Sequence, residues 1–111
     1  MTTTKVVKTY FRLYSGKLTK VQKRKLRRAV SAIPEDAEVA VKARGMVRAE
    51  GATKADRKRA KQRAKAVRAY LKTRGVPGSA ISVNNKGRTQ SQSAKARRVN
   101  VRFTYATTAL G

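Results

Sequence analysis

The sequence contains no cysteine, no histidine and only five acidic residues among its 111. It therefore has no disulfide, no Cys/His zinc site, no thiol nucleophile and no histidine-based catalytic triad. No run approaches the roughly 20 consecutive apolar residues of a membrane-spanning helix. These absences exclude most catalytic classes, and we predict a non-enzymatic protein without a metal or cofactor.

The positions of the acids argue against a carboxylate enzyme as well. Three of them lie at positions 35–38, next to Pro34, where we expect a solvated turn. A paired-carboxylate hydrolase needs two acids that converge from separate elements. Only Glu50 and Asp56 remain for that role.

Positive charge is the dominant feature of the composition. The chain has 29 Lys and Arg residues and a formal net charge of +24, and residues 1–34 and 57–111 contain no acid. Solubility of a small domain requires a net charge of only about 2 to 8. The excess predicts salt-dependent binding to a polyanion, and nucleic acid, anionic lipid and acidic wall polymers all qualify.

Alternating β-branched and aromatic residues predict four strands. Three are expected over 5–14, 38–47 and 99–105, and a short one over 81–83. In the first strand, the apolar face would consist of Val7, Phe11 and Leu13. Residues 84–96 are expected to form a polar loop.

A helix is predicted after the first strand. Thr19 and Gln22 have the spacing of a capping box, in which each side chain bonds the backbone of the other residue. Pro34 marks the end of this helix. Leu18 and Val21 would contribute to its apolar face.

A second, longer helix is predicted to run to about Thr73, with either Thr53 or Asp56 as its cap. Apolar residues recur on it with a helical period and should face the core. They are Ala60, Ala64, Val67 and Leu71.

The expected element order is β-α-β-α-β-β within a single domain over residues 1–111. Because two helices can cover only one face of a sheet, the predicted fold class is α+β. The architecture is a two-layer sandwich in which both helices cover one face of a mixed four-stranded sheet.

Several segments of the chain resemble the OmpA-like family, the peptidoglycan-associating C-terminal domain of outer membrane protein A. They are FRLYSGKL at 11–18, GMVRAEG at 45–51, RAKAVRAYLKTRGV at 63–76, Ile81 and RRVNV at 97–101. They occur in the family's order and span nearly the whole chain. The resemblance implies the same sandwich fold, association with peptidoglycan and a place in the cell envelope.

The resemblance also implies a binding pocket with one altered charge. Arg63 stands at the family's arginine, which binds the carboxylate of diaminopimelate, but Arg48 stands where the family has the aspartate that binds the ammonium. Such a pocket would suit a phosphate or a pair of carboxylates. Alternatively, Arg48 is a solvated loop residue and Arg63 pairs with Glu50 or Asp56.

Other pocket positions depart from the family as well. Met46 and Val47 replace its histidine and threonine, and Asp56 and Arg59 replace its asparagine and leucine. Six arginines are the predicted ligand-binding residues. They are Arg44, Arg48, Arg59, Arg63, Arg97 and Arg98.

The leading functional hypothesis is a cell-envelope or secreted domain whose basic surface binds peptidoglycan or an anionic wall polymer. The first residues lack the apolar segment of a signal peptide, so this hypothesis implies an export signal ahead of Thr2.

Two alternatives stay open. One is a cytoplasmic or virion protein that binds nucleic acid or the ribosome, and the other is an assembly subunit such as a phage particle component. Beyond net charge, the nucleic-acid alternative has one signal, aromatic residues beside basic ones: Tyr10 with Arg12 and Tyr14, and Tyr70 with Arg74. Such aromatics stack bases in RNA-binding sheets, and the second face of the sheet is the only place for that platform.

Overall fold

The computed structural model describes residues 2–90 and 96–106. Within them the chain forms four strands, two α-helices and one short 3-10 helix. In chain order these are β1 (Thr2–Tyr10), α1 (Lys20–Ser31), β2 (Val39–Arg48), α2 (Lys54–Thr73), η1 (Gly78–Ala80), β3 (Ile81–Thr89) and β4 (Arg98–Ala106).

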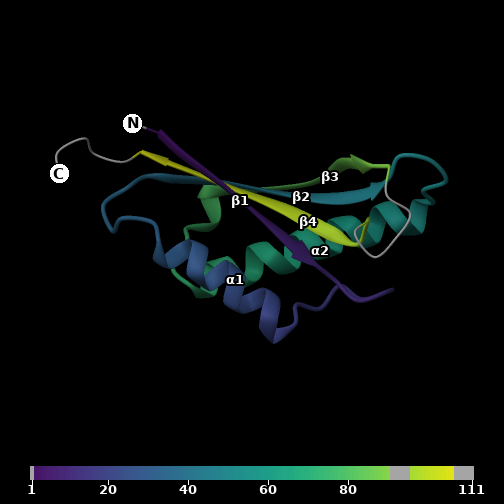
Figure 1. The fold of residues 1–111 in the computed structure, drawn as a ribbon, viewed down its shortest axis with the longest axis horizontal. Helices are drawn as coiled ribbons and strands as arrows, with labels where there is room; N and C mark the ends of the chain where they lie inside the picture. The colour runs from purple at the N-terminus through teal and green to yellow at the C-terminus, as the bar shows by residue number, and fades with distance from the viewer. Residues whose placement is uncertain (1, 91–95, 107–111) are drawn as a thin grey trace.

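The four strands form one mixed sheet in the order β1-β4-β2-β3. Strand β4 is antiparallel to both β1 and β2, and β2 is parallel to β3. Parallel neighbours require a long crossover, which α2 provides. Both helices lie on the same side of the sheet (Figure 1), which confirms the predicted two-layer α+β sandwich.

The core lies between the sheet and the helices. Strand β4 turns four fully or nearly fully buried residues toward it, Val99, Val101, Phe103 and Tyr105. The predicted stripe of α2 is buried as expected, and α1 contributes Leu26 and Ala29. No helix in the described part of the chain is long and apolar enough to span a membrane.

Helix α2 packs unusually close to β2 at Gly45. A Cβ atom built at this glycine would lie 2.3 Å from the backbone oxygen of Ala60. Because this is far inside van der Waals contact, only glycine allows the two backbones to approach so closely. The close approach places the first turns of α2 beside the end of β2, where the candidate site lies.

The first strand lies earlier in the chain than predicted, over Thr2–Tyr10 instead of 5–14. Strand β1 ends at Tyr10, and Leu13 is 58% exposed rather than part of the core. The backbone N–H of Phe11 donates to the Arg97 carbonyl, and then the chain turns, with Tyr14 at a φ of 59°. The expectation failed because the alternating pattern continues into this turn.

The third strand is longer than predicted, because residues 84–89 continue β3 instead of opening a loop. An irregularity between Arg44 and Met46 shifts the register so that Met46 pairs with Gly87. A Cβ at Gly87 would lie 2.1 Å from the Met46 sulfur, so the glycine makes room for that side chain. Positions 91–95 of the predicted loop lie outside the described residues.

Only half of the predicted capping box at α1 forms. Thr19 accepts from the Gln22 backbone N–H at 3.4 Å, but the Gln22 side chain accepts from the Tyr10 N–H at 3.1 Å. Gln22 therefore ties the start of α1 to the end of β1. Val21, expected on the apolar face, is 58% exposed, whereas Leu18 is buried.

We expect Gly45→Ala to lower the free energy of unfolding by about 1 to 3 kcal/mol, the usual cost of overpacking a core. The added methyl would push α2 away from β2. Gly16→Ala is the matched control, because its Cβ would lie at an ordinary 3.8 Å from Gln62. Urea denaturation of both variants tests the prediction, and equal stabilities for the two would contradict it.

Candidate functional site

The candidate site begins at the first turn of α2, which is fixed by a complete capping box. The Thr53 hydroxyl accepts from the Asp56 N–H at 3.1 Å, and the Asp56 carboxylate accepts from the Thr53 N–H at 3.0 Å. Thr53 is therefore the N-cap and Asp56 the third helical residue, which decides between the two predicted caps. The box fixes the Asp56 carboxylate at the end of β2.

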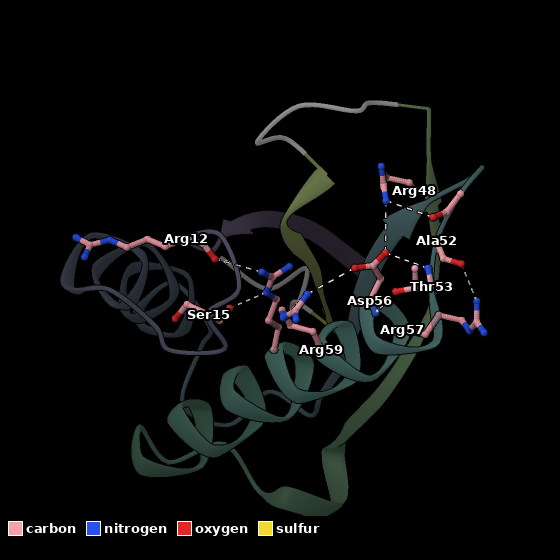
Figure 2. Close-up of polar contacts among 10 residues, drawn as sticks. Arg12, Ser15, Arg48, Ala52, Thr53, Asp56, Arg57 and Arg59 are labelled. Atoms are coloured by element: carbon pink, nitrogen blue, oxygen red, sulfur yellow. Dashed lines mark hydrogen bonds and ion pairs between the residues drawn. The ribbon is translucent and has the colours of Figure 1, made fainter.

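Asp56 binds two arginines from different elements. Its carboxylate lies 3.5 Å from Arg48, the last residue of β2, and 3.6 Å from Arg59, one turn along α2. Figure 2 shows the carboxylate between these two guanidinium groups. The N–H of Thr53 is the largest influence on the Asp56 carboxyl and lowers its pKa, Arg48 acts in the same direction, and partial burial opposes them.

Arg63 holds the turn that follows β1 against α2. Its side chain comes from α2, and the residue is only 6% exposed. Nε donates to the Ser15 carbonyl at 2.8 Å, and Nη2 donates to the Arg12 carbonyl at 3.2 Å. Burial, with a smaller contribution from the neighbouring cations Arg59 and Arg97, lowers the pKa of Arg63 to about 10, against the opposing effect of Asp56.

A second arginine and two aromatic rings complete this wall. Nε of Arg97 donates to the Phe11 carbonyl at 3.2 Å. The guanidinium of Arg63 lies 5.5 Å from the centre of the Phe11 ring, and that of Arg59 lies 5.1 Å from the Tyr14 ring. These cation–π contacts orient the guanidinium groups without neutralising them.

These groups surround one cavity of about 260 Å³. This is slightly below the roughly 300 to 1,000 Å³ of most small-molecule sites, so the cavity suits one small polar group. Four guanidinium groups and one carboxylate give it a formal charge of +3. The lining residues are Leu13, Tyr14, Met46, Val47, Arg48, Asp56, Arg59, Arg63, Ala96 and Arg97.

The structure separates the six predicted arginines into two groups. Arg48, Arg59, Arg63 and Arg97 all line the cavity. The other two, Arg44 and Arg98, lie at outward positions of β2 and β4, on the face of the sheet that the helices leave uncovered.

The prediction of a wholly cationic pocket was wrong, because the cavity also contains the carboxylate of Asp56. The sequence predicted that Arg48 would make the site wholly cationic, or that Arg63 would pair with Glu50 or Asp56. In the structure Arg48 pairs with Asp56, and Arg63 donates to backbone carbonyls. The threonine–aspartate spacing was the signal for the missed pairing of Arg48 with Asp56, because a capping box directs the Asp56 carboxylate toward the strand end.

The architecture and this cavity define a small α+β domain with an arginine-lined site at the end of a central strand. The OmpA family model matches residues 10–103 of the chain. The chain therefore belongs to the OmpA family.

Solved structures show the same fold. The OmpA-like domain of FopA1 from Francisella tularensis matches with a TM-score of 0.67 and 21% identity, over 96% of this chain and 78% of that one. The peptidoglycan-associated lipoprotein of Burkholderia pseudomallei gives 0.64 and 17%, over 89% of each chain. The C-terminal domain of Helicobacter pylori MotB gives 0.65 and 21%, over 91% and 84%. No curated protein sequence matches the chain.

The capping box predicts a pH dependence that separates its two members. Because the pKa of Asp56 is lowered in the folded state, its stabilisation is present above its ordinary value of 3.8 and is lost as the pH falls through the folded pKa. Asp56→Ala should cost about 1 kcal/mol at neutral pH, and this difference from wild type should shrink in acid.

Thr53→Ala is the control for this measurement. It removes a cap of similar strength but leaves the carboxylate in place, so its cost should persist as the pH falls. Urea denaturation of the three proteins across the acid range provides the comparison. A cost for Asp56→Ala that stays constant with pH would contradict the role of the ionised carboxylate.

Proposed function

We propose that this chain is a non-enzymatic binding domain of the cell envelope, which attaches to peptidoglycan and its anionic polymers. Membership in the OmpA family supports a location in the cell envelope, and so does the fold shared with a peptidoglycan-associated lipoprotein. The observation that carries the proposal is the arginine-lined cavity at the end of β2. Arg48 and Arg63, the positions that the sequence resemblance aligns with the family's peptidoglycan pocket, both line it.

The cavity has donors available for an anion. A guanidinium group has five N–H donors, and the hydrogen bonds of Arg63 to described residues use two of them. Arg97 uses one on the Phe11 carbonyl. Because guanidinium groups bind carboxylate and phosphate through paired hydrogen bonds, the cavity would bind a stem-peptide carboxylate or a phosphate ester.

The same cavity disfavours an ammonium group. The one acid in its lining, Asp56, already contacts Arg48, Arg59 and the Thr53 N–H. An ammonium would have to displace a guanidinium from this carboxylate in a site of net positive charge. We therefore expect the cavity to bind a peptidoglycan stem through its carboxylates alone, without the zwitterionic clamp of the family.

The nucleic-acid alternative has only the net charge in its favour. The cavity is too small for a nucleotide chain to enter, and Tyr14, the aromatic residue in its lining, is already contacted by Arg59. Base stacking needs exposed ring faces. The site geometry thus favours the hypothesis of cell-envelope binding over that of nucleic-acid binding.

Retention on purified sacculi tests the proposal at the level of the polymer. We expect the protein to be retained at about 150 mM salt, where surface charges further apart than about 8 Å are screened. Removal of wall polymers from the sacculi should reduce retention of the protein. Immobilised random duplex DNA of matched charge should retain less protein than intact sacculi do. Retention on DNA together with indifference to wall-polymer removal would overturn the proposal.

Arg59→Gln tests the cavity itself. Loss of one charge-assisted hydrogen bond should weaken binding of a stem tripeptide with free carboxylates by about tenfold. Arg57→Gln is the matched control, because Arg57 is the same residue type on α2 but donates to the Ala52 carbonyl outside the cavity. Titration calorimetry with the peptide and its amidated form should show binding only to free carboxylates, and equal effects of both variants would contradict the assignment.

Arg48→Asp restores an acid at the family position. In this variant a second carboxylate would stand beside Asp56, and the cavity should gain preference for diaminopimelate over its N-acylated form. The ammonium is then held by a carboxylate that no guanidinium occupies. Competition between the two compounds measures the gain, and an unchanged preference would show that position 48 does not correspond to the family's pocket aspartate.

A further inference from the structure

We propose that the uncovered face of the sheet is a second binding surface, which takes a linear polyanion whose charges lie on its backbone. The surface is centred on Lys42, Arg44 and Arg102, and Lys8 extends it toward the β1 edge. This inference rests on the proposed function for the identity of the polymer, an anionic wall chain. The surface itself is argued from its own geometry.

Cations from three strands converge on this face. Register pairs Arg102 of β4 with Lys42 of β2 on one side and with Val6 of β1 on the other. The next row pairs Asn100 with Arg44 and with Lys8. Adjacent strands lie about 4.8 Å apart, so these cations form a compact group that exists only in the folded sheet.

The face has no carboxylate to balance them. None of the four strands contains an Asp or Glu residue. Like charges directly opposite each other across a sheet are destabilising, and Lys42 lies opposite Arg102. An anion between these strands would turn that repulsion into attraction.

A shallow hollow marks where such an anion would bind. It has a volume of about 110 Å³ and is lined by Val6, Lys42, Arg44, Asn100 and Arg102. The Asn100 amide oxygen accepts from Arg98 at 3.1 Å, while among the described residues its NH₂ group contacts the weak acceptor Met46 Sδ, at 3.7 Å. The hollow thus offers three cations and an amide donor to a group of phosphate size.

The aromatic residues argue against a base-stacking ligand. Among the described residues, Tyr10 is the aromatic at an outward position of the sheet, and Lys25 lies over its ring at 5.2 Å. Phe103 and Tyr105 of β4 face the core. Single-stranded nucleic acid is normally bound by bases stacked on exposed rings, so a polymer without bases fits this face better.

Binding of long-chain inorganic polyphosphate tests the surface without any cell-wall material. We compare wild type with Lys42→Gln/Arg102→Gln and with Lys61→Gln/Lys65→Gln, which removes the same charge from the exposed side of α2. All four residues are exposed, so neither variant disturbs the core. The sheet variant should weaken binding by about tenfold and reduce the log–log salt slope by about 1.4, and the helix variant should change each far less.

Equal losses in the two variants would overturn the inference, because binding would then follow net charge alone. Tighter binding of oligothymidine than of polyphosphate, with the same sensitivity to the sheet variant, would also overturn it and assign the face to nucleic acid. Arg59→Gln separates this surface from the cavity. It should weaken polyphosphate binding far less than the sheet variant does, so failure of the stem-peptide assay alone would contradict the proposed cavity function and not this surface.

Discussion

The hydrogen bonds from the Arg63 guanidinium to the carbonyls of Arg12 and Ser15 are the interaction on which the site depends. A buried charge is tolerated only when it is hydrogen-bonded, and here the partners come from a turn far away in the sequence. Gly45 makes this possible, since α2 can then lie against β2. Arg63, about one turn after Ala60, thereby reaches the turn after β1, and the cavity gains a wall.

This arrangement leaves the site short of negative charge. Backbone carbonyls satisfy the geometry of the Arg63 guanidinium but do not neutralise it, and burial with two neighbouring arginines lowers its pKa to about 10. The side chain remains charged at neutral pH, so the folded protein bears an electrostatic cost that an anion in the cavity would offset. Perturbed charges of this kind gather at functional sites more often than elsewhere.

The sequence pattern correctly predicted the helices and strands that have a strong periodicity. It gave wrong bounds for the strands whose ends are set by tertiary contacts. The predictions of the apolar stripe of α2 and of the strands β2 and β4 were correct, because each pattern arises from burial of one face of the element. The extension of β3 depends on a register shift that makes room for Met46 over Gly87, which no local pattern shows. Leu13 continued the alternation but lies in the turn that Arg63 holds.

Prediction of the site had the same limit. The resemblance to the OmpA-like family identified Arg48, Arg59, Arg63 and Arg97, which all line the cavity. The balance of charge among them required knowledge of which side chains meet, because the alignment placed Asp56 at a pocket position without showing that it contacts Arg48 and Arg59. The acid of the cavity comes from the first turn of the helix, where the capping box holds the Asp56 carboxylate.

The cavity and the sheet face are close enough to act on one polymer. Arg44 and Arg48 are four residues apart on β2, a distance of about 13 Å along an extended strand. A wall chain with both stem carboxylates and a polyanionic backbone would therefore meet two sites on one rigid element. When one site is occupied, binding at the other becomes intramolecular, and overall retention can exceed either affinity by a large factor. Weak contacts at each surface would then suffice to hold the domain on a polymer, while small anions, which reach only one site, would be released.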